Sequence, residues 1–160
     1  MVFSKLIYAI LLTIAPITEL RVGLPLALSY GVENNLPLIL IFINIVLINI
    51  LMIFFIFFLL DNIHKYLMKI SLYRRLFNVY IKRFQKKVDK FERKYESMGF
   101  IALVLFVAVP LPGTGAWTGS LLAWLLELDR KKSILAISLG VFIAGLLIFL
   151  GTLGFLYLFY

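Results

Sequence analysis

Two charged residues, Glu19 and Arg21, are the side chains in this sequence best placed to do chemistry, because they interrupt a long apolar stretch. They are the only charges within four such stretches of the 160-residue chain. A charge at the centre of a bilayer costs about 2.5–3.5 kcal/mol on insertion scales, so residues kept there are functional candidates. Arg21 is of the type that binds carboxylate or phosphate, and Glu19 is of the type that carries a proton. The alternative is a structural ion pair, which requires a break because helix positions two apart do not face each other.

Proline and glycine divide the first and third apolar stretches, residues 6–32 and 97–126, into two arms each, and the hairpin predicted from the third extends to 127. An arm of about 10–14 residues is shorter than the roughly 20 that a helix needs to cross the hydrocarbon. We therefore expect two re-entrant helical hairpins, whose broken backbone must be covered by protein or water. The residues predicted to make the breaks are Pro16, Pro25, Pro110 and Pro112.

The breaks also predict a binding site at the hairpin tips. The second arm of each hairpin begins near a threonine, Thr18 or Thr114, and its free N–H groups favour an anion at mid-membrane. Gly113 and Gly115 either let backbone approach a ligand closely or only make the turn. Trp117 either packs within the break or contacts substrate. These residues, with Glu19 and Arg21, form the predicted substrate or ion site.

The second and fourth stretches are predicted to be transmembrane helices, over residues 36–60 and 133–158. Pro37 suits the first turn of one, and Ser133 is a plausible cap for the other. Asn44 and Asn49 lie in the first helix, where such residues join helices or line a pathway, and Asn44 is added to the candidate site. Ala136, Gly140 and Ala144 form a seam of small residues in the second.

A repeat relates the two halves of the chain. Shifting the sequence by 96 residues places five identical pairs in register, and it overlays 36–60 on 132–156. The pairs are Pro16 with Pro112, Thr18 with Thr114, Gly23 with Gly119, Leu26 with Leu122, and Ala27 with Ala123. Broken segments at matching positions in two halves are typical of transporter binding sites. We therefore expect a first repeat over 1–62, a basic segment over 63–96, and a second repeat over 97–160.

The charge distribution predicts the topology. Residues 64–96 contain eleven Lys and Arg and three acidic residues, which accounts for the whole net charge of +8. If the first and third stretches are hairpins, this segment and the basic loop 129–132 lie on the same side, as the positive-inside rule favours. The repeats are then inverted. Apolar residues recur every three to four positions through the basic segment, which predicts a cytoplasmic amphipathic helix that packs on the protein, lies on anionic lipid or forms a dimer.

The composition predicts a membrane protein. Hydrophobic residues make up 63% of the chain and charged residues 15%, with no cysteine and one histidine. A soluble domain has about half apolar and a quarter charged residues. The sequence holds no nucleophile–base pair, nucleotide loop or metal-ligand cluster, so we expect no enzyme activity, cofactor or metal. The basic residues are confined to one block, which argues against nucleic acid as a partner.

Two fragments, PITELRVGLPLAL (16–28) and VPLPGTGAWTGSLLA (109–123), resemble the small multidrug export protein family of prokaryotic membrane proteins. That family is similar in turn to DedA-type proteins, which share paired re-entrant hairpins and are associated with proton-driven movement of polyprenyl-phosphate lipids. DedA-type members carry arginines around the second Pro-Gly, and Pro110 to Trp117 contains none.

The sequence therefore predicts an all-α integral membrane protein of the cell membrane, with each half a re-entrant hairpin plus one transmembrane helix. The function we expect is secondary transport of a small or amphiphilic solute, coupled to protons. The alternatives are a DedA-like flippase of polyprenyl-phosphate or another anionic lipid, and a membrane scaffold that does not transport. Two hairpins and two spanning helices are few to cover broken backbone, so we expect a homodimer or larger assembly in contact with membrane lipids.

Overall fold

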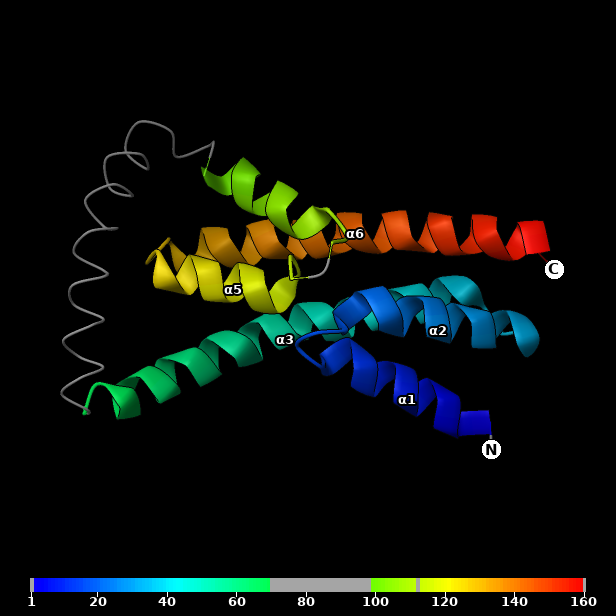
Figure 1. Cartoon of the computed structure of the whole chain (residues 1–160), viewed down its shortest axis with the longest axis horizontal. Helices are drawn as coiled ribbons and strands as arrows, with labels where there is room; N and C mark the ends of the chain where they lie inside the picture. The colour runs from blue at the N-terminus through cyan, green and yellow to red at the C-terminus, as the bar shows by residue number, and fades with distance from the viewer. Residues whose placement is uncertain (1, 70–98, 112, 160) are drawn as a thin grey trace.

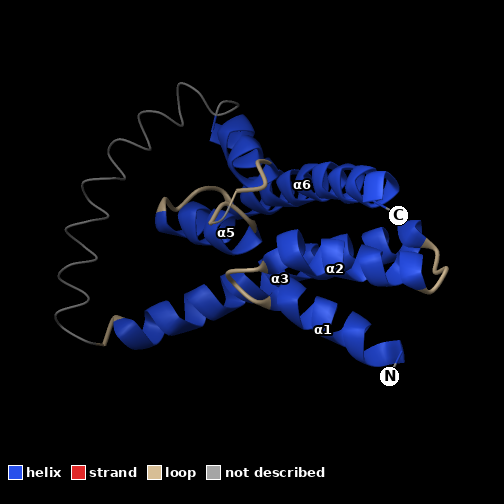
Figure 2. Cartoon of the chain, turned by 45° about the vertical axis from the view of Figure 1, so that its right-hand side comes forward, coloured by secondary structure: helices blue, strands red, loops and turns tan. Residues whose placement is uncertain are grey.

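A computed structural model of the chain describes residues 2–69, 99–111 and 113–159, and each regular element in these residues is an α-helix (Figures 1 and 2). The first half contains α1 (Val2–Ile14), α2 (Glu19–Glu33) and α3 (Leu38–Leu67). The second half contains a helix over Gly99–Ala108, called the 99–108 helix below, then α5 (Ala116–Leu125) and α6 (Arg130–Phe159). The all-α class is confirmed for the described residues. The predicted amphipathic helix falls mostly on residues 70–98, outside them.

The two halves have the same order of elements, namely two short helices joined by a break and then one long helix. The long helices α3 and α6 have 30 residues each, which corresponds to a length of about 45 Å. In Figure 1 the hairpin of α1 and α2 approaches from the right and the hairpin of the 99–108 helix and α5 from the left. Their breaks meet near the middle of the molecule.

The long helices start and end at different residues from those predicted. Helix α3 continues seven residues past the predicted end at 60, to Leu67. Helix α6 begins at Arg130, and Asp129 caps it by accepting a hydrogen bond of 2.8 Å from the Lys132 N–H. The prediction of Ser133 as the cap is therefore wrong. The carboxylate of Asp129 is the better cap because it is charged and faces the positive end of the helix.

Pro25 does not break its helix, and this prediction is also wrong. It lies inside α2, between Leu24 and Leu28, which are fully buried. The missing N–H of a proline costs a helix about 3 kcal/mol, and burial of a leucine side chain returns about 1.5–3 kcal/mol. Packing of α2 against α1, α3 and α6 therefore offsets the local cost.

Both hairpins end in the same turn. Asn35 after α2 and Glu127 after α5 each have φ of 52°, and the N–H groups of Leu36 and Leu128 donate back to Gly31 and Ala123. This is the Schellman motif, which satisfies the last carbonyls of a helix. These turns, like the starts of α3 and α6, lie 92 residues apart. The predicted overlay of 36–60 on 132–156 is therefore out of register by four residues, because α5 is about one turn shorter than α2.

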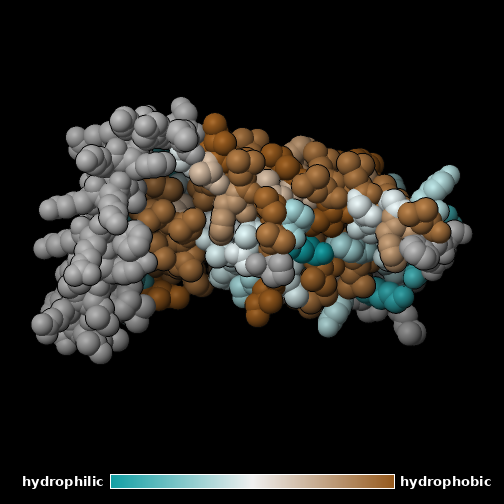
Figure 3. All heavy atoms as spheres, turned by 45° about the horizontal axis from the view of Figure 1, so that its top comes forward, coloured by the Kyte–Doolittle hydropathy of each residue, from teal (hydrophilic) through white to brown (hydrophobic). Residues whose placement is uncertain are grey.

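The core lies where α2 and α5 pack between the long helices α3 and α6. Its buried residues include Leu20, Ile53, Val107 and Ile137. Large apolar side chains also cover the outside, and Figure 3 shows hydrophobic residues over most of one face. Among the described helices, Leu38–Tyr66 and Arg130–Leu158 are long and apolar enough to cross a membrane. An exposed apolar surface of this extent requires a lipid or protein environment.

Small residues bring the helices of the second half together, as the seam in α6 predicts. Ala136 and Ala144 are buried, and Gly140 faces the 99–108 helix. A Cβ added at Gly140 would lie 2.6 Å from the Cβ of Val107 and 2.8 Å from the carbonyl oxygen of Val104. The backbone contact leaves no room for a side chain at this position.

Gly140→Ala should therefore destabilise the protein, by about 1–3 kcal/mol, the usual cost of forcing an extra carbon into a packed core. Gly151→Ala, in the same helix, is the matched control, because nothing lies within 4 Å of its added Cβ. This control should be neutral or stabilising, since alanine favours a helix by about 1 kcal/mol over glycine. The check is the melting temperature of each purified variant in detergent. Equal melting temperatures would contradict the close helix contact.

Candidate functional site

The first break covers Ala15 to Thr18 and turns the chain from α1 into α2. Pro16 lies within the turn, as predicted, and cannot donate the N–H that would continue α1. The Thr18 hydroxyl donates back to the carbonyl of Leu12, in the last turn of α1. Glu19, the first residue of α2, has φ of 48°, in the left-handed region that few residues other than glycine adopt. The carboxylate thus leaves the backbone at an unusual angle.

The second break runs from Val109 to Gly115, with Pro110 inside it. The hydroxyl of Thr114 closes it as Thr18 closes the first, since its oxygen lies 2.7 Å from the carbonyl of Val109 and 2.9 Å from that of Leu111. Gly113 supplies the turn with φ of 83°, and an added Cβ there would meet nothing within 4 Å. Pro112, predicted to be part of this break, lies outside the described residues.

Glu19 joins the two breaks. Its side chain is 4% exposed, and its Oε1 accepts a hydrogen bond of 3.0 Å from the backbone N–H of Trp117, the second residue of α5. The first N–H groups of a helix have no partner within it, and they favour negative charge. A carboxylate on the first hairpin therefore caps the opening helix turn of the second.

Gly115 provides the space for this carboxylate. A Cβ at this position would lie 1.4 Å from Glu19 Oε2. The backbone of Gly115 is extended, with φ of −104° and ψ of −156°, which any residue can adopt. The glycine is therefore required here for close approach to Glu19 and not for its conformational freedom.

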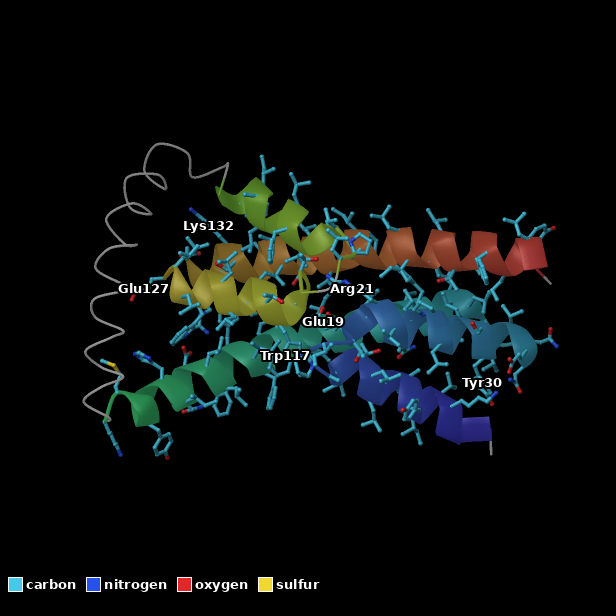
Figure 4. All side chains as sticks on the ribbon, viewed as in Figure 1. Glu19, Arg21, Tyr30, Trp117, Glu127 and Lys132 are labelled. Carbon is cyan, nitrogen blue, oxygen red and sulfur yellow. The ribbon has the colours of Figure 1, made fainter. Side chains whose placement is uncertain are left out.

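Two further hydrogen bonds link the breaks, where Figure 4 shows Glu19, Arg21 and Trp117 close together. The half-buried Arg21 donates from Nη2 to the Thr114 hydroxyl oxygen at 2.8 Å. The indole Nε1 of Trp117 donates to the carbonyl of Ile14 at 3.0 Å, which satisfies an acceptor at the end of α1. The structure thus brings Glu19 and Arg21 together with Thr114, Gly115 and Trp117.

Asn44 does not join this group. It is exposed on α3, and its amide donates to the carbonyl of Leu40 in its own helix at 2.8 Å. Asn49 lies nearer the tips: it is 1% exposed and donates to the carbonyl of Thr13, 3.3 Å away. The sequence places both asparagines on one helix. They point to different sides of α3, so Asn44 lies on the surface and Asn49 lies under the first break. The candidate site should include Asn49 in place of Asn44.

The arrangement offers one titratable carboxylate in a dry environment, a neighbouring guanidinium and two hydroxyls. Within the described residues no three metal-ligating side chains gather. These groups are of the types that exchange a proton, as a carboxyl does, and that form hydrogen bonds, as guanidinium and hydroxyl groups do.

Gly115→Ala should push the Glu19 carboxylate away from α5 and lower the melting temperature, with a loss of about 1–3 kcal/mol. Gly99→Ala is the control, since its added Cβ meets nothing within 4 Å. In a double-mutant cycle, Glu19→Ala vacates the space that the new methyl needs. Gly115→Ala should then cost little in the Glu19→Ala background. Additive losses would contradict the contact between these residues.

Residues 19–147 match the model of one protein family, described as "Putative small multi-drug export protein". No curated protein and no solved structure matches the chain. The family match includes Glu19, both residues that it contacts at the second break, and most of the two long apolar helices. Since the match covers most of the chain, this is a membrane protein that belongs to the small multi-drug export family.

Proposed function

We propose that the protein is a proton-coupled secondary transporter that moves a small or amphiphilic solute, with its coupling site where the two breaks meet. The observation that carries this proposal is the buried Glu19 carboxylate on the first turn of α5. An ionisable group in the middle of an apolar helix bundle is expensive to keep. The Glu19 carboxylate also forms the contact between the two hairpins. We expect separation of the hairpin tips to open a path for the solute.

Protonation of Glu19 changes that contact. An ionised carboxylate accepts the Trp117 N–H strongly and is favoured by the helix terminus, whereas the neutral acid loses the charge that both effects use. Taking up a proton therefore loosens the link between the hairpins, and releasing it restores the link. This gives the coupling that a secondary transporter needs between proton binding and access to its cargo.

Arg21 also joins the two breaks, so its interactions change when the contact at Glu19 changes. Its bond to Thr114 is a second link between the tips, beside that of Trp117. When the tips part, the guanidinium loses this partner and becomes available to an anionic group of the cargo. The anion-binding role of Arg21, like the roles of Thr18 and Gly113, stays a prediction.

An inverted repeat accounts for how the tips meet. Gly115 lies 96 residues after Glu19, which is the shift that aligns the two breaks, so equivalent positions abut where a twofold axis would pass. Gly23 and Gly119, another aligned pair, each face the first arm of their own hairpin, at Thr13 and Val107 respectively. Both observations support two hairpins of the same construction that are related by an inverted repeat.

The proposed topology follows from where the long helices end. Asp61 near the end of α3 and Arg130 at the start of α6 form a salt bridge of 2.9 Å, so these ends lie together. The 99–108 helix and α5 then enter and leave on one side, as a re-entrant hairpin does. We propose that this side, with the basic segment, faces the cytoplasm. The homodimer and the lipid contacts stay predictions.

A second candidate function is movement of an anionic lipid, as in DedA-type proteins. The second break has no arginine among its described residues, yet Arg21 reaches Thr114 there from the first break. The one guanidinium of Arg21 therefore lies where the two tips meet. Transfer of a fluorescently labelled anionic phospholipid across proteoliposomes, measured by quenching of the outer leaflet, distinguishes this function from solute export.

Glu19→Gln should abolish proton coupling while folding and membrane insertion stay largely intact. Glutamine keeps an acceptor for the Trp117 N–H but cannot titrate. The measurement is internal pH in proteoliposomes that contain a pH-sensitive dye, after an ethidium gradient is imposed. Glu33→Gln is the control, because Glu33 is exposed and paired with Lys5 at 3.3 Å. Full proton movement in Glu19→Gln would remove the proposed role.

A brace without a transport role predicts a different pattern from the same residues. If Glu19 and Arg21 only brace the hairpins of a protein that transports by other residues, Glu19→Gln lowers the melting temperature, and a Glu19→Gln, Arg21→Gln variant recovers stability and proton movement together. Under the transport proposal the double variant stays inactive. Arg21→Lys should weaken solute binding more than stability, because lysine keeps the charge and loses the planar fork.

Impermeant labelling tests the topology. The chain has no cysteine, so single cysteines at Lys69, Lys131 and Asn34 give no background. All three positions are exposed. We expect the cysteines at 69 and 131 to react from the cytoplasmic side, and the one at 34 from the opposite side, with a membrane-impermeant maleimide. Reaction of the cysteine at 131 from the same side as that at 34 would show that the second hairpin crosses the membrane.

A further inference from the structure

A second polar site lies at the far end of α5 from Glu19. A pocket of about 460 Å³ opens between the end of α3, the end of α5 and the start of α6. Trp117 and Trp124 are seven residues apart on α5, so the pocket lies about 10 Å along the helix from the Glu19 contact. Its lining combines aromatic and charged side chains: Phe57, Asp61, His64, Trp124, Glu127 and Arg130.

In the structure the guanidinium of Arg130 occupies the space between the Asp61 carboxylate and the Phe57 ring. Its Nη2 is 3.0 Å from Asp61 Oδ1 and 2.9 Å from Oδ2, and its central carbon lies 4.3 Å from the centre of the Phe57 ring. The Trp124 indole donates to the same Asp61 carboxylate at 2.8 Å. His64 packs edge-on against Trp124, with ring centres 5.0 Å apart. A planar, delocalised cation is thus held between a carboxylate and an aromatic face.

We propose that this pocket binds an amphiphilic organic cation, which takes the place of the Arg130 guanidinium. With Arg130 withdrawn, the charged residues in the described part of the lining are Asp61, Glu127 and Lys65. The Asp61 carboxylate then lacks the cation that lies against it in the structure, and a monovalent organic cation supplies that charge. The aromatic faces of Phe57 and Trp124 suit the apolar body of such a ligand and attract its charge.

Arg130 is suited to leave. Its side chain is 45% exposed and that of Asp61 40%, and exposed ion pairs are worth only about 0.2–1 kcal/mol. Arg130 is also the first residue of α6, where the helix dipole disfavours positive charge. Withdrawal into solvent leaves the Trp124–Asp61 hydrogen bond in place, so the carboxylate stays oriented for the incoming cation.

The inference deepens the proposed export function and rests on it for the cation to be cargo, but binding itself is measurable without transport. The experiment is equilibrium dialysis of tetraphenylphosphonium against the purified full chain in detergent, with protein-free micelles as the blank. The variants are Asp61→Asn, Arg130→Ala and Lys131→Ala. Lys131 is the matched control, because it is the adjacent exposed residue of α6, carries the same charge and does not line the pocket.

Arg130→Ala should bind tetraphenylphosphonium about threefold to tenfold more tightly, because it removes a competitor that occupies the site most of the time. Asp61→Asn should bind at least about tenfold more weakly, a loss of about 1.4 kcal/mol. Lys131→Ala should bind like the unchanged protein. Tetraphenylborate, the anion of the same shape, should not compete. These results together support a cation site.

Other outcomes overturn it. Equal changes in Arg130→Ala and Lys131→Ala would show a general effect of charge, and competition by tetraphenylborate would show an apolar surface without charge selection. Unchanged affinity in Arg130→Ala would leave Asp61 and Arg130 as an ion pair only, and this variant stays decisive if Asp61→Asn does not fold. Loss of proton coupling in Glu19→Gln with normal cation binding would separate the two sites. Absence of proton coupling in the unchanged protein would contradict the proposed transport function, and the measured binding of tetraphenylphosphonium would still stand.

Discussion

The contact between the two hairpins centres on the hydrogen bond from the Trp117 N–H to the buried carboxylate of Glu19. Its energetics explain why such a residue is tolerated. A carboxylate at the bilayer centre costs about 2.5–3.5 kcal/mol on insertion scales. A hydrogen bond to a charged group contributes about 1.5–3 kcal/mol, and the helix terminus adds about 0.3–1 kcal/mol. The interactions offset the cost closely.

The same contact solves a problem that both breaks create. A helix that starts inside an apolar bundle exposes N–H groups that neither lipid nor neighbouring aliphatic side chains can satisfy. Each hairpin supplies what the other lacks. The first provides the Glu19 carboxylate for α5 and the carbonyl of Ile14 for the indole of Trp117, and the second provides the hydroxyl of Thr114 for Arg21. Neither hairpin is therefore complete by itself, and their association is built into the polar groups at the breaks.

Two polar sites at opposite ends of α5 give this short helix a central place in the proposed mechanism. Its first turn is bound to Glu19, and Trp124 near its last turn is bound to Asp61 on α3. A movement of α5 that loosens one contact must act on the other, since ten residues of helix behave as a rigid rod. Under the two proposals, a cation near Asp61 and a proton at Glu19 would both act on the position of α5, which is the physical requirement for coupling two ligands.

Much of this architecture follows from the sequence alone, because apolar length, helix breakers and isolated charges are local signals. Continuous apolar runs predict α3 and α6, and Pro16 and the PGTG segment predict the breaks. Glu19 and Arg21 are recognised as candidates because a charge in an apolar stretch costs free energy. The shift of 96 residues aligns Glu19 with Gly115, and the structure brings these two positions into contact. The family match over residues 19–147 agrees with the resemblance carried by the two fragments around the breaks.

Only the tertiary structure decided which of these features act together. Proline usually breaks a helix, yet α2 continues through Pro25 because Leu24 and Leu28 on either side are buried. Asn44 and Asn49 have the same chemistry on the same helix, and the rotation of α3 against α1 buries the second and exposes the first. Nothing in the sequence pairs Asp61 with Arg130, because they lie 69 positions apart on different helices. Local preferences determine where helices form and stop, whereas the face that each helix buries, and hence which charges meet, depends on packing energies between distant segments.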